Sequence, residues 1–364
     1  MVSIPDSMTA AQLVGTGGPE MLVVRHDVPV PEPAADEVLI RVRACGMNNT
    51  DINTRVGWYS KSVTGATDGQ GFSGVGEDGA WDGEGVDFPR IQGADPCGEV
   101  VAVGESADPS LLGQRVLVDA WVRDKADPTD RAKAHYLGSE RDGGYAQFCA
   151  VPARNVYPID SALTDVELAS FPCSWSTAEH MLTRARLTNG ETAVVTGASG
   201  GVGTALIQLA KLRGARVVAV TSTAKFDDVV ECGADIVVDR STRDLYEAVV
   251  DAARGPADVL ADVVGGPGFA ALLGLLRHGG RYTTAGAIAG PIVELDLRTL
   301  YLNDLELHGC TVYEPEVFAT LVGYIQRGEV CPVVAGTFPL DDIHSAQEAF
   351  VAKNHTGNLV VTVS

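Results

Sequence analysis

Residues 191–225 read ETAVVTGASGGVGTALIQLAKLRGARVVAVTSTAK. The β-branched run at 193–196 is typical of a buried strand, and the glycine cluster at 197–203 is typical of a tight turn. Apolar residues then recur at helical spacing over 205–212, and a second apolar run at 215–220 predicts another strand. The stretch therefore predicts a β-α-β unit that binds a mononucleotide, because such a unit takes about 30 residues.

The glycine cluster has a physical explanation. A pyrophosphate that lies against the N–H groups of a helix N-terminus needs a turn without side chains, because a Cβ would block its approach. An ordinary loop in a chain with 41 glycines is the alternative, but the position between a strand and an amphipathic helix favours a dinucleotide site of the form AxGxxG. The residues predicted to bind the cofactor at this turn are Ala198, Ser199, Gly200, Gly201, Val202 and Gly203.

The end of the second strand indicates which dinucleotide binds. An NAD site usually has a carboxylate about 20 residues after the glycines for the ribose 2′-hydroxyl, whereas a 2′-phosphate favours hydroxyls and a cation. Residues 220–225 read VTSTAK, and the first acid is Asp227. Ser222, Thr223 and Lys225 therefore predict NADPH as the cofactor. The alternative is that Lys225 only begins the next helix.

Composition excludes several classes of partner. With 364 residues, two domains are expected rather than one apolar core. The 27 Lys and Arg against 48 Asp and Glu give a net charge of −21, which disfavours nucleic acid and anionic membrane surfaces. Seven cysteines stand singly with no CxxC pair, which favours reduced thiols. Neither a secretory leader nor an apolar run of about 18 residues is recognisable, so a cytoplasmic protein with no membrane partner is expected.

The regions on either side of the β-α-β unit differ in pattern. Short alternating runs and turns over 11–152 predict a mostly antiparallel β domain. Strands and helices alternate from 226 to about 307, which predicts a parallel sheet with helices on its faces. The polar segment at 57–89 is too long for a simple turn, and it is either a mobile lid or an inert insertion.

Motifs along almost the whole chain resemble those of the medium-chain dehydrogenases/reductases. They are VLIRVRACGMNNTD (38–51), GADPCGEVVAVG (93–104), GQRVLV (113–118), GGYAQFCAVPARNVYPI (143–159), DVVGG (262–266) and KNHTGNLVV (353–361). The resemblance implies an α/β protein with a GroES-like β domain, residues 1–170 and 314–364, and a Rossmann domain with a doubly wound parallel sheet, residues 171–313. It also implies an active site in the cleft between the domains, a small-molecule substrate and a homodimer.

The positions of the family's zinc ligands indicate the branch. Catalytic zinc needs three N, S or O ligands around an open fourth position. Where the zinc alcohol dehydrogenases have Cys, His-Glu and Cys, this chain has Asn48, Ala94-Asp95 and Cys173. No metal site is therefore expected, and Cys173 is interpreted as a buried, inert thiol. The chain instead resembles the zinc-independent quinone oxidoreductases and enoyl reductases, whose glycine motif is AxGxxG and whose cofactor is usually NADPH.

The same resemblance implies catalytic residues. Residues 48–59 are similar to the NPSDIN…GxY stretch of the enoyl thioester reductases, with Asn49 in place of the proline, and this implies a catalytic Tyr59. Hydride addition to a quinone, enone or enoyl thioester leaves an enolate that neutral groups must stabilise and protonate. Tyr59 and Asn48 are suited to this, and Thr177 matches a position beside the nicotinamide. The alternatives are packing for Tyr59, a turn for Asn48 and a bond to the helix backbone for Thr177.

Three residues after predicted strands complete the expected site. Gly265, Ala285 and Gly286 match loops that approach the nicotinamide in the family, with an ordinary turn as the alternative. The leading prediction is thus an NADPH-dependent, zinc-independent reductase of an activated carbon–carbon double bond. An NADP-dependent alcohol dehydrogenase or carbonyl reductase, and an NADPH-binding protein without turnover, are the alternatives.

Overall fold

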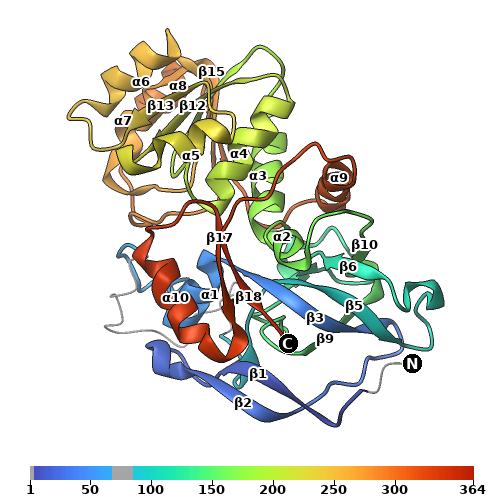
Figure 1. The fold of residues 1–364 in the computed structure, drawn as a ribbon. Coiled ribbons are helices and arrows are strands. Elements are labelled where there is room, and N and C mark those ends of the chain that lie inside the picture. Colours follow the sequence, from blue (N-terminus) through green and yellow to red (C-terminus); the bar gives the residue numbers. More distant parts are fainter. Residues whose placement is uncertain (1–3, 68–84) are drawn as a thin grey trace. The chain divides into compact units, whose positions relative to one another are not determined.

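The computed structural model describes residues 4–67 and 85–364. The chain divides into two compact units, which Figure 1 shows as ribbons. Of the described residues, unit 1 comprises 4–63, 85–173 and 314–364, and unit 2 comprises 64–67 and 174–313.

Unit 1 consists mainly of antiparallel strands. The strands are β1 (Ser7–Leu13), β2 (Leu22–Pro29), β3 (Glu37–Met47), β4 (Arg90–Ile91), β5 (Asp95–Val103), β6 (Arg115–Val118), β7 (Trp121–Val122), β8 (His135–Tyr136), β9 (Phe148–Pro152), β10 (Val156–Pro158), β17 (Val334–Pro339) and β18 (Asn358–Thr362). The large sheet has the order β10-β6-β5-β3-β18-β17, with β9 also paired to β3. A smaller sheet has the order β2-β1-β4, and β7 pairs with β8. The helices are α1 (Asn49–Val56), α2 (Asp165–Ala169), α9 (Pro315–Gln326) and α10 (Ile343–Ala352).

The long strand β3 shows how the sequence pattern sets the core of unit 1. Val38, Ile40 and Val42 are buried, whereas Arg41 and Arg43 between and after them are more exposed. Because alternate residues of a strand point to opposite faces, this alternation marks the inward face of β3 over 40–43, whereas Leu39, next to Ile40, is buried as well. The C-terminal strand β18 then pairs with β3 in the antiparallel sense.

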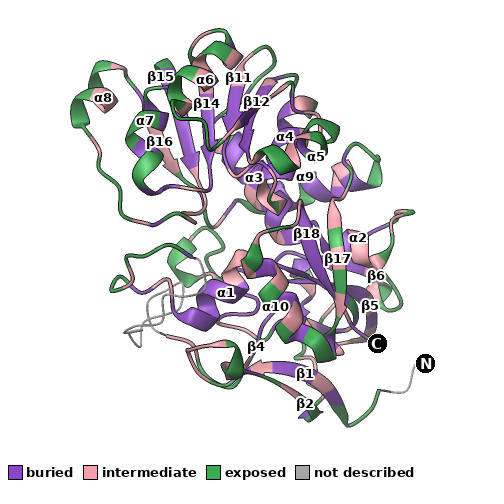
Figure 2. Ribbon diagram, turned by 60° about the vertical axis from the view of Figure 1, so that its left-hand side comes forward, coloured by how far each residue is buried: buried purple, intermediate pink, exposed green. Residues whose placement is uncertain are grey.

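Unit 2 contains a six-stranded parallel sheet with helices on it. The strands are β11 (Thr192–Val195), β12 (Arg216–Thr221), β13 (Ile236–Asp239), β14 (Ala257–Asp262), β15 (Leu276–Thr284) and β16 (Glu306–Gly309), in the order β13-β12-β11-β14-β15-β16. The helices are α3 (Pro172–Arg184), which begins at the boundary with unit 1, and α4 (Gly201–Leu212), α5 (Phe226–Glu231), α6 (Leu245–Ala253), α7 (Phe269–Leu273) and α8 (Leu297–Leu302). Val194, Val218 and Leu260 form part of its core, and Figure 2 shows their strands as buried.

The predicted fold class, an antiparallel β domain together with a parallel α/β sheet, is confirmed. Within the described ranges, the helices are all too short or too polar to cross a membrane. Most of the segment at 57–89 lies outside the described residues, so its role as a lid or an insertion stays a prediction. Of its described part, Thr67 donates its backbone N–H to the Ile288 carbonyl at 3.0 Å.

Candidate functional site

The glycine-rich turn connects the carboxyl end of β11 to the N-terminus of α4. Gly197 has a φ of +57°, which favours glycine. A Cβ on Gly203 would lie 2.3 Å from the Gly197 carbonyl oxygen, so a side chain there would push the helix away from the turn. A Cβ on the exposed Gly200 would be 3.5 Å from that same oxygen, an ordinary contact, so the protein itself does not require this glycine. In the described part of the chain no side chain caps α4, which leaves its first N–H groups for an anion.

The remaining residues of the turn have different surroundings. Ala198 is fully buried and donates its N–H to the Val220 carbonyl at 3.2 Å, so it holds the turn against β12. Ser199, Gly201 and Val202 are half-buried. The turn therefore offers a small, backbone-lined cradle that fits a pyrophosphate.

The predicted 2′-phosphate residues follow β12. Ser222 and Lys225 are half-buried, whereas Thr223 is exposed. The Thr223 hydroxyl donates to a carboxylate oxygen of Asp239 at 2.6 Å, so this hydroxyl already has a partner. Burial lowers the pKa of the Lys225 ammonium, and the positive charge of Arg240 lowers it further. Lys225 and Arg240 are thus two neighbouring cations at one end of the sheet.

Arg240 was absent from the sequence prediction. It directly follows β13, which pairs with β12, and its N–H donates to the Thr221 carbonyl at 2.8 Å. The order of the strands could have revealed Arg240, because residues that follow adjacent parallel strands lie at the same edge of the sheet.

Two loops meet where β14 and β15 end. Gly265 has a φ of +60°, and a Cβ on it would lie 3.1 Å from the Gly290 carbonyl oxygen. Ala289 donates its N–H to the Val264 carbonyl at 2.8 Å. The structure thus places Gly265 beside the loop that begins with Ala285 and Gly286, both half-buried. Thr177 is half-buried on α3 and belongs to the same unit.

A buried polar cluster in unit 1 contains the predicted catalytic residue Asn48. Its Nδ2 donates to Asp95 Oδ2 at 2.8 Å, and the Cys173 N–H donates to Asp95 Oδ1 at 3.0 Å. The Asn48 N–H and the Tyr145 hydroxyl each donate to Asp51 Oδ2, both at 2.8 Å. Asp95 is 1% exposed and Asp51 is 2% exposed. We call Asn48, Asp51, Asp95, Tyr145 and Cys173 the Asn48 cluster.

The two carboxylates of the Asn48 cluster resist ionisation. Burial raises the pKa of Asp51 to about 6, although hydrogen bonds from Asn48 and Tyr145 oppose the rise. Burial also raises the pKa of Asp95 well above its usual range, and the charge of Asp51 raises it further. The hydrogen bond from Asn48 partly offsets both effects at Asp95.

The Asn48 cluster does not fit a catalytic zinc. Both oxygens of Asp95 accept N–H groups, and the Cys173 sulfur accepts from the Tyr136 hydroxyl at 3.1 Å. An amide, an engaged carboxylate and one thiol do not make the three-ligand set that zinc needs. Within residues 4–67 and 85–364, no group of three or more His, Cys, Asp and Glu side chains is arranged to hold a metal ion. Cys173 itself is half-buried, not buried as the sequence suggested.

Tyr59 follows α1, whose N-terminus is capped by the Asn48 segment. Its hydroxyl donates to Thr50 Oγ1 at 3.1 Å, and its ring meets that of Trp58 edge-on with centroids 5.8 Å apart. Burial raises the pKa of the Tyr59 phenol, and hydrogen bonds with Thr50 and Asn53 oppose the rise. The phenol therefore stays protonated at neutral pH, as a proton donor must.

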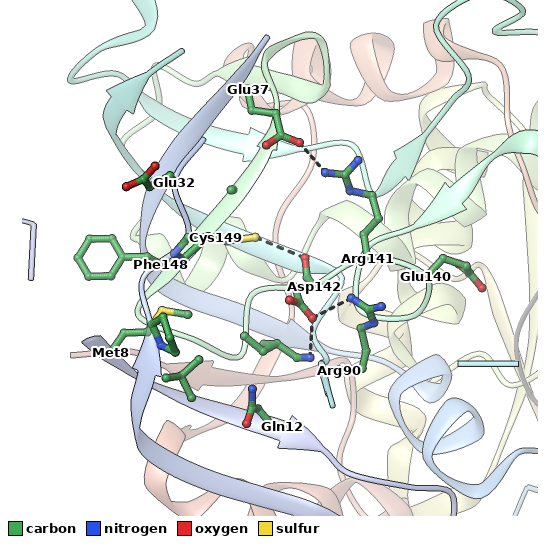
Figure 3. Close-up of a pocket in the computed structure, with 16 residues that line it drawn as sticks. Met8, Gln12, Glu32, Glu37, Arg90, Glu140, Arg141, Asp142, Phe148 and Cys149 are labelled. Atoms are coloured by element: carbon green, nitrogen blue, oxygen red, sulfur yellow. Dashed lines mark hydrogen bonds and ion pairs between the residues drawn. The ribbon is translucent and has the colours of Figure 1, made fainter. Parts of the chain in front are cut away.

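Figure 3 shows a separate pocket of about 350 Å³ in unit 1. Four of its charged lining residues form two ion pairs, since Arg90 bonds to Asp142 at 2.9 Å and Arg141 bonds to Glu37. None of the described residues that line it belongs to the predicted site. The pocket therefore offers no support for the predicted chemistry.

Comparisons with known proteins agree with this architecture. Residues 34–161 match the model of the alcohol dehydrogenase GroES-like domain, and residues 201–327 match that of the zinc-binding dehydrogenases. The chain is 27% identical to a quinone oxidoreductase of Mus musculus over 97% of each chain. It is 28% identical to an acryloyl-coenzyme A reductase of Metallosphaera sedula, over 93% of this chain and 95% of that protein. A crystal structure from Sinorhizobium meliloti, provisionally assigned as an alcohol dehydrogenase, is 50% identical with a TM-score of 0.88, over 99% of this chain and 98% of that one.

We expect Asp51 to make stability depend on pH. Its folded-state pKa of about 6 lies above the unfolded value of about 4, so the folded state binds the proton more tightly. The free energy of unfolding should therefore fall by about 3 kcal/mol as the pH rises from about 4 to about 6. Asp51→Asn has no carboxyl group to titrate at this position. The difference in the free energy of unfolding between wild type and variant, measured by urea unfolding, should therefore change by this amount over the same pH range. A difference that stays constant with pH would contradict the prediction.

Proposed function

Since the chain belongs to the medium-chain dehydrogenase/reductase superfamily, we propose that it reduces an activated carbon–carbon double bond with NADPH and without zinc. It is an oxidoreductase of the quinone oxidoreductase and enoyl reductase-like branch. The proposed substrate class is a small quinone, enone or enoyl thioester. Relatives that are named quinone oxidoreductase and acryloyl-coenzyme A reductase support this class.

The proposal depends above all on the hydrogen bond between Asn48 and Asp95. In the zinc-dependent members a metal ion stabilises the charge on the substrate oxygen. Here the same positions hold an amide that a buried carboxylate orients at 2.8 Å. A neutral amide donor can stabilise a developing oxyanion, and the donor set offers no place for zinc.

The residues of unit 1 supply two kinds of neutral donor. NADPH, when bound, would supply a hydride from C4 of its nicotinamide. Addition of that hydride to the β-carbon would leave negative charge on the substrate carbonyl oxygen. Asn48 Nδ2 carries two N–H groups and gives one to Asp95, so the other can stabilise that oxygen. The protonated Tyr59 phenol then gives its proton to the enolate.

The residues of unit 2 would hold the cofactor. The backbone of the glycine turn and the N-terminus of α4 would bind the pyrophosphate. Ser222, Lys225 and the newly identified Arg240 would bind the 2′-phosphate, because two cations suit a dianion. Gly265 and the loop with Ala285 and Gly286 would lie beside the nicotinamide, as would Thr177.

The second candidate is an NADP-dependent alcohol dehydrogenase or carbonyl reductase. It is favoured by the 50% identical structure, which is provisionally assigned as an alcohol dehydrogenase. This reading requires a metal in the purified protein and a loss of activity with chelators. The donor set of the Asn48 cluster argues against it. Binding of NADPH without turnover of any substrate would instead indicate a non-catalytic protein.

We also propose a homodimer formed beside the edge strand β16. Ile292, Leu297, Tyr301 and Leu302 are 61 to 68% exposed, and three of them lie on α8, which Figure 2 shows as largely exposed. Large apolar side chains that gather on one surface indicate an interaction site. Among the described strands β16 lies at the edge of its sheet, so its outer side can pair with a second copy.

The proposed reaction predicts that the protein oxidises NADPH after an assay has shown it to be free of zinc. The substrate panel consists of 1,4-quinones, enones and a crotonyl thioester, with NADH as the comparison cofactor. We expect turnover with NADPH in at least one of these classes and no inhibition by a chelator. Activity that rises and falls with bound zinc would contradict the proposal.

The cofactor site predicts an effect on NADPH alone. Lys225→Ala and Arg240→Ala should each weaken NADPH binding by about tenfold, because each removes one charge from the 2′-phosphate site. NADH affinity should stay within about twofold. Lys211→Ala is the control, because Lys211 pairs with Asp235. An equal loss for both dinucleotides would show that these cations do not select the 2′-phosphate.

The role of Tyr59 predicts a loss in kcat. Tyr59→Phe removes the proton donor and keeps the ring, so kcat should fall by about 100-fold while KM changes little. Tyr157→Phe is the control, because this tyrosine packs against Phe318. A kcat within about twofold of wild type would show that Tyr59 is not the proton donor and only packs.

The dimer predicts twice the monomer mass in sedimentation at micromolar concentration. Leu302→Asp places a charge in the exposed apolar surface and should shift the protein to monomers. Leu212→Asp, an exposed leucine on α4, is the control. Monomeric wild-type protein would overturn this part of the proposal.

A further inference from the structure

Asp262, the last residue of β14, is completely buried and accepts four hydrogen bonds. The Thr196 hydroxyl and the Val264 N–H, the latter at 2.9 Å, donate to Oδ1. The Tyr282 hydroxyl at 2.8 Å and the Gly265 N–H at 3.1 Å donate to Oδ2. No ion pair formed within the described ranges involves Asp262. Among the described residues, the hydrogen bonds to its carboxyl oxygens come from neutral donors near the carboxyl edge of one sheet.

Three of these donors, Thr196, Val264 and Gly265, belong to or directly precede the segments that the proposed function assigns to the cofactor. Thr196 immediately precedes the glycine turn, and a Cβ on Gly197 would lie 2.8 Å from Val263 Cγ2. Val264 and Gly265 belong to the loop after β14. That loop in turn accepts the Ala289 N–H at the Val264 carbonyl. The Asp262 carboxyl group thus connects the glycine turn to the loop after β14. That loop in turn connects to the loop after β15.

The loop after β14 needs such an anchor. Gly265 and Gly266 both have a positive φ, +60° and +68°, and consecutive glycines of this kind are conformationally free. A Cβ on Gly266 would lie 2.6 Å from the Ala289 carbonyl oxygen, so the two loops are closely packed. The two N–H groups that Asp262 accepts fix the direction in which this free segment leaves the strand.

We propose that Asp262 is a positioning residue that holds the glycine turn and the loop at 263–266 in the relative arrangement that the dinucleotide needs. This role rests on the proposed use of a nicotinamide dinucleotide. Asp262 itself has no contact with the cofactor, because its oxygens face the protein donors and its side chain is buried. The 2′-phosphate end near Lys225 follows β12, and it receives no bond from Asp262 in the described part of the chain.

The test compares two ligands that report on different ends of the site. NADPH spans the glycine turn and the loop at 263–266, whereas 2′-AMP carries only the adenine, the ribose and the 2′-phosphate. Asp262→Asn replaces one acceptor oxygen by an amide and should weaken NADPH binding by about tenfold, measured by NADPH fluorescence titration. The affinity for 2′-AMP, measured by calorimetry, should stay within about twofold.

Two further variants keep the test decisive if Asp262→Asn does not fold. Thr196→Val and Tyr282→Phe each remove one hydroxyl donor to the same carboxylate, but only Thr196 adjoins a cofactor segment. Thr196→Val should weaken NADPH binding more than Tyr282→Phe at a similar loss of stability. Equal NADPH affinities for these two variants, or an Asp262→Asn protein that keeps wild-type affinity or loses both ligands in parallel, would overturn the positioning role. Wild-type protein that binds neither ligand would overturn the proposed cofactor itself.

Discussion

A buried carboxylate, Asp95, joins three distant parts of the chain in unit 1. It accepts the Asn48 amide from the start of α1 and the Cys173 N–H from the start of α3, while it begins β5 itself. Gly46 makes this meeting sterically possible, since a Cβ there would lie 2.3 Å from the Ala169 carbonyl oxygen and 2.9 Å from Asp95. The orientation of Asn48, and with it the proposed stabilisation of the substrate oxygen, depends on this contact.

The same physical solution recurs at Asp51 and Asp262. Each of the three carboxyl groups is buried and accepts N–H donors, joined at Asp51 and Asp262 by a tyrosine hydroxyl, and no ion pair of the described residues includes any of them. A buried polar group without hydrogen bonds is costly, so each of these carboxyl groups needs several well-placed donors. In unit 1 burial raises the pKa of both carboxyl groups although these donors oppose the rise, and in unit 2 the carboxyl group joins the segments proposed to bind the cofactor.

Local patterns were predictable from the sequence, and contacts between distant segments were not. The β-α-β unit, the fold class and the family are confirmed because the glycine turn and its flanking strands are encoded in one continuous stretch. Arg240 escaped prediction because its place depends on the order of β12 and β13. The Thr223 bond to Asp239 escaped for the same reason. The contacts of Asp95 with Asn48 and Cys173 could not be predicted from sequence spacing, because Asn48 and Cys173 lie 47 and 78 residues from Asp95 along the chain.

The most direct measurement of the central claim is the destination of the hydride. The protein would be supplied with NADPH that carries deuterium at the transferred C4 position, together with a crotonyl thioester and an enone, and the products would be analysed by NMR. For reduction of the double bond we expect deuterium at the β-carbon of a saturated product, with a solvent proton at the α-carbon. Deuterium on a carbinol carbon, formed by reduction of the carbonyl group, would contradict it.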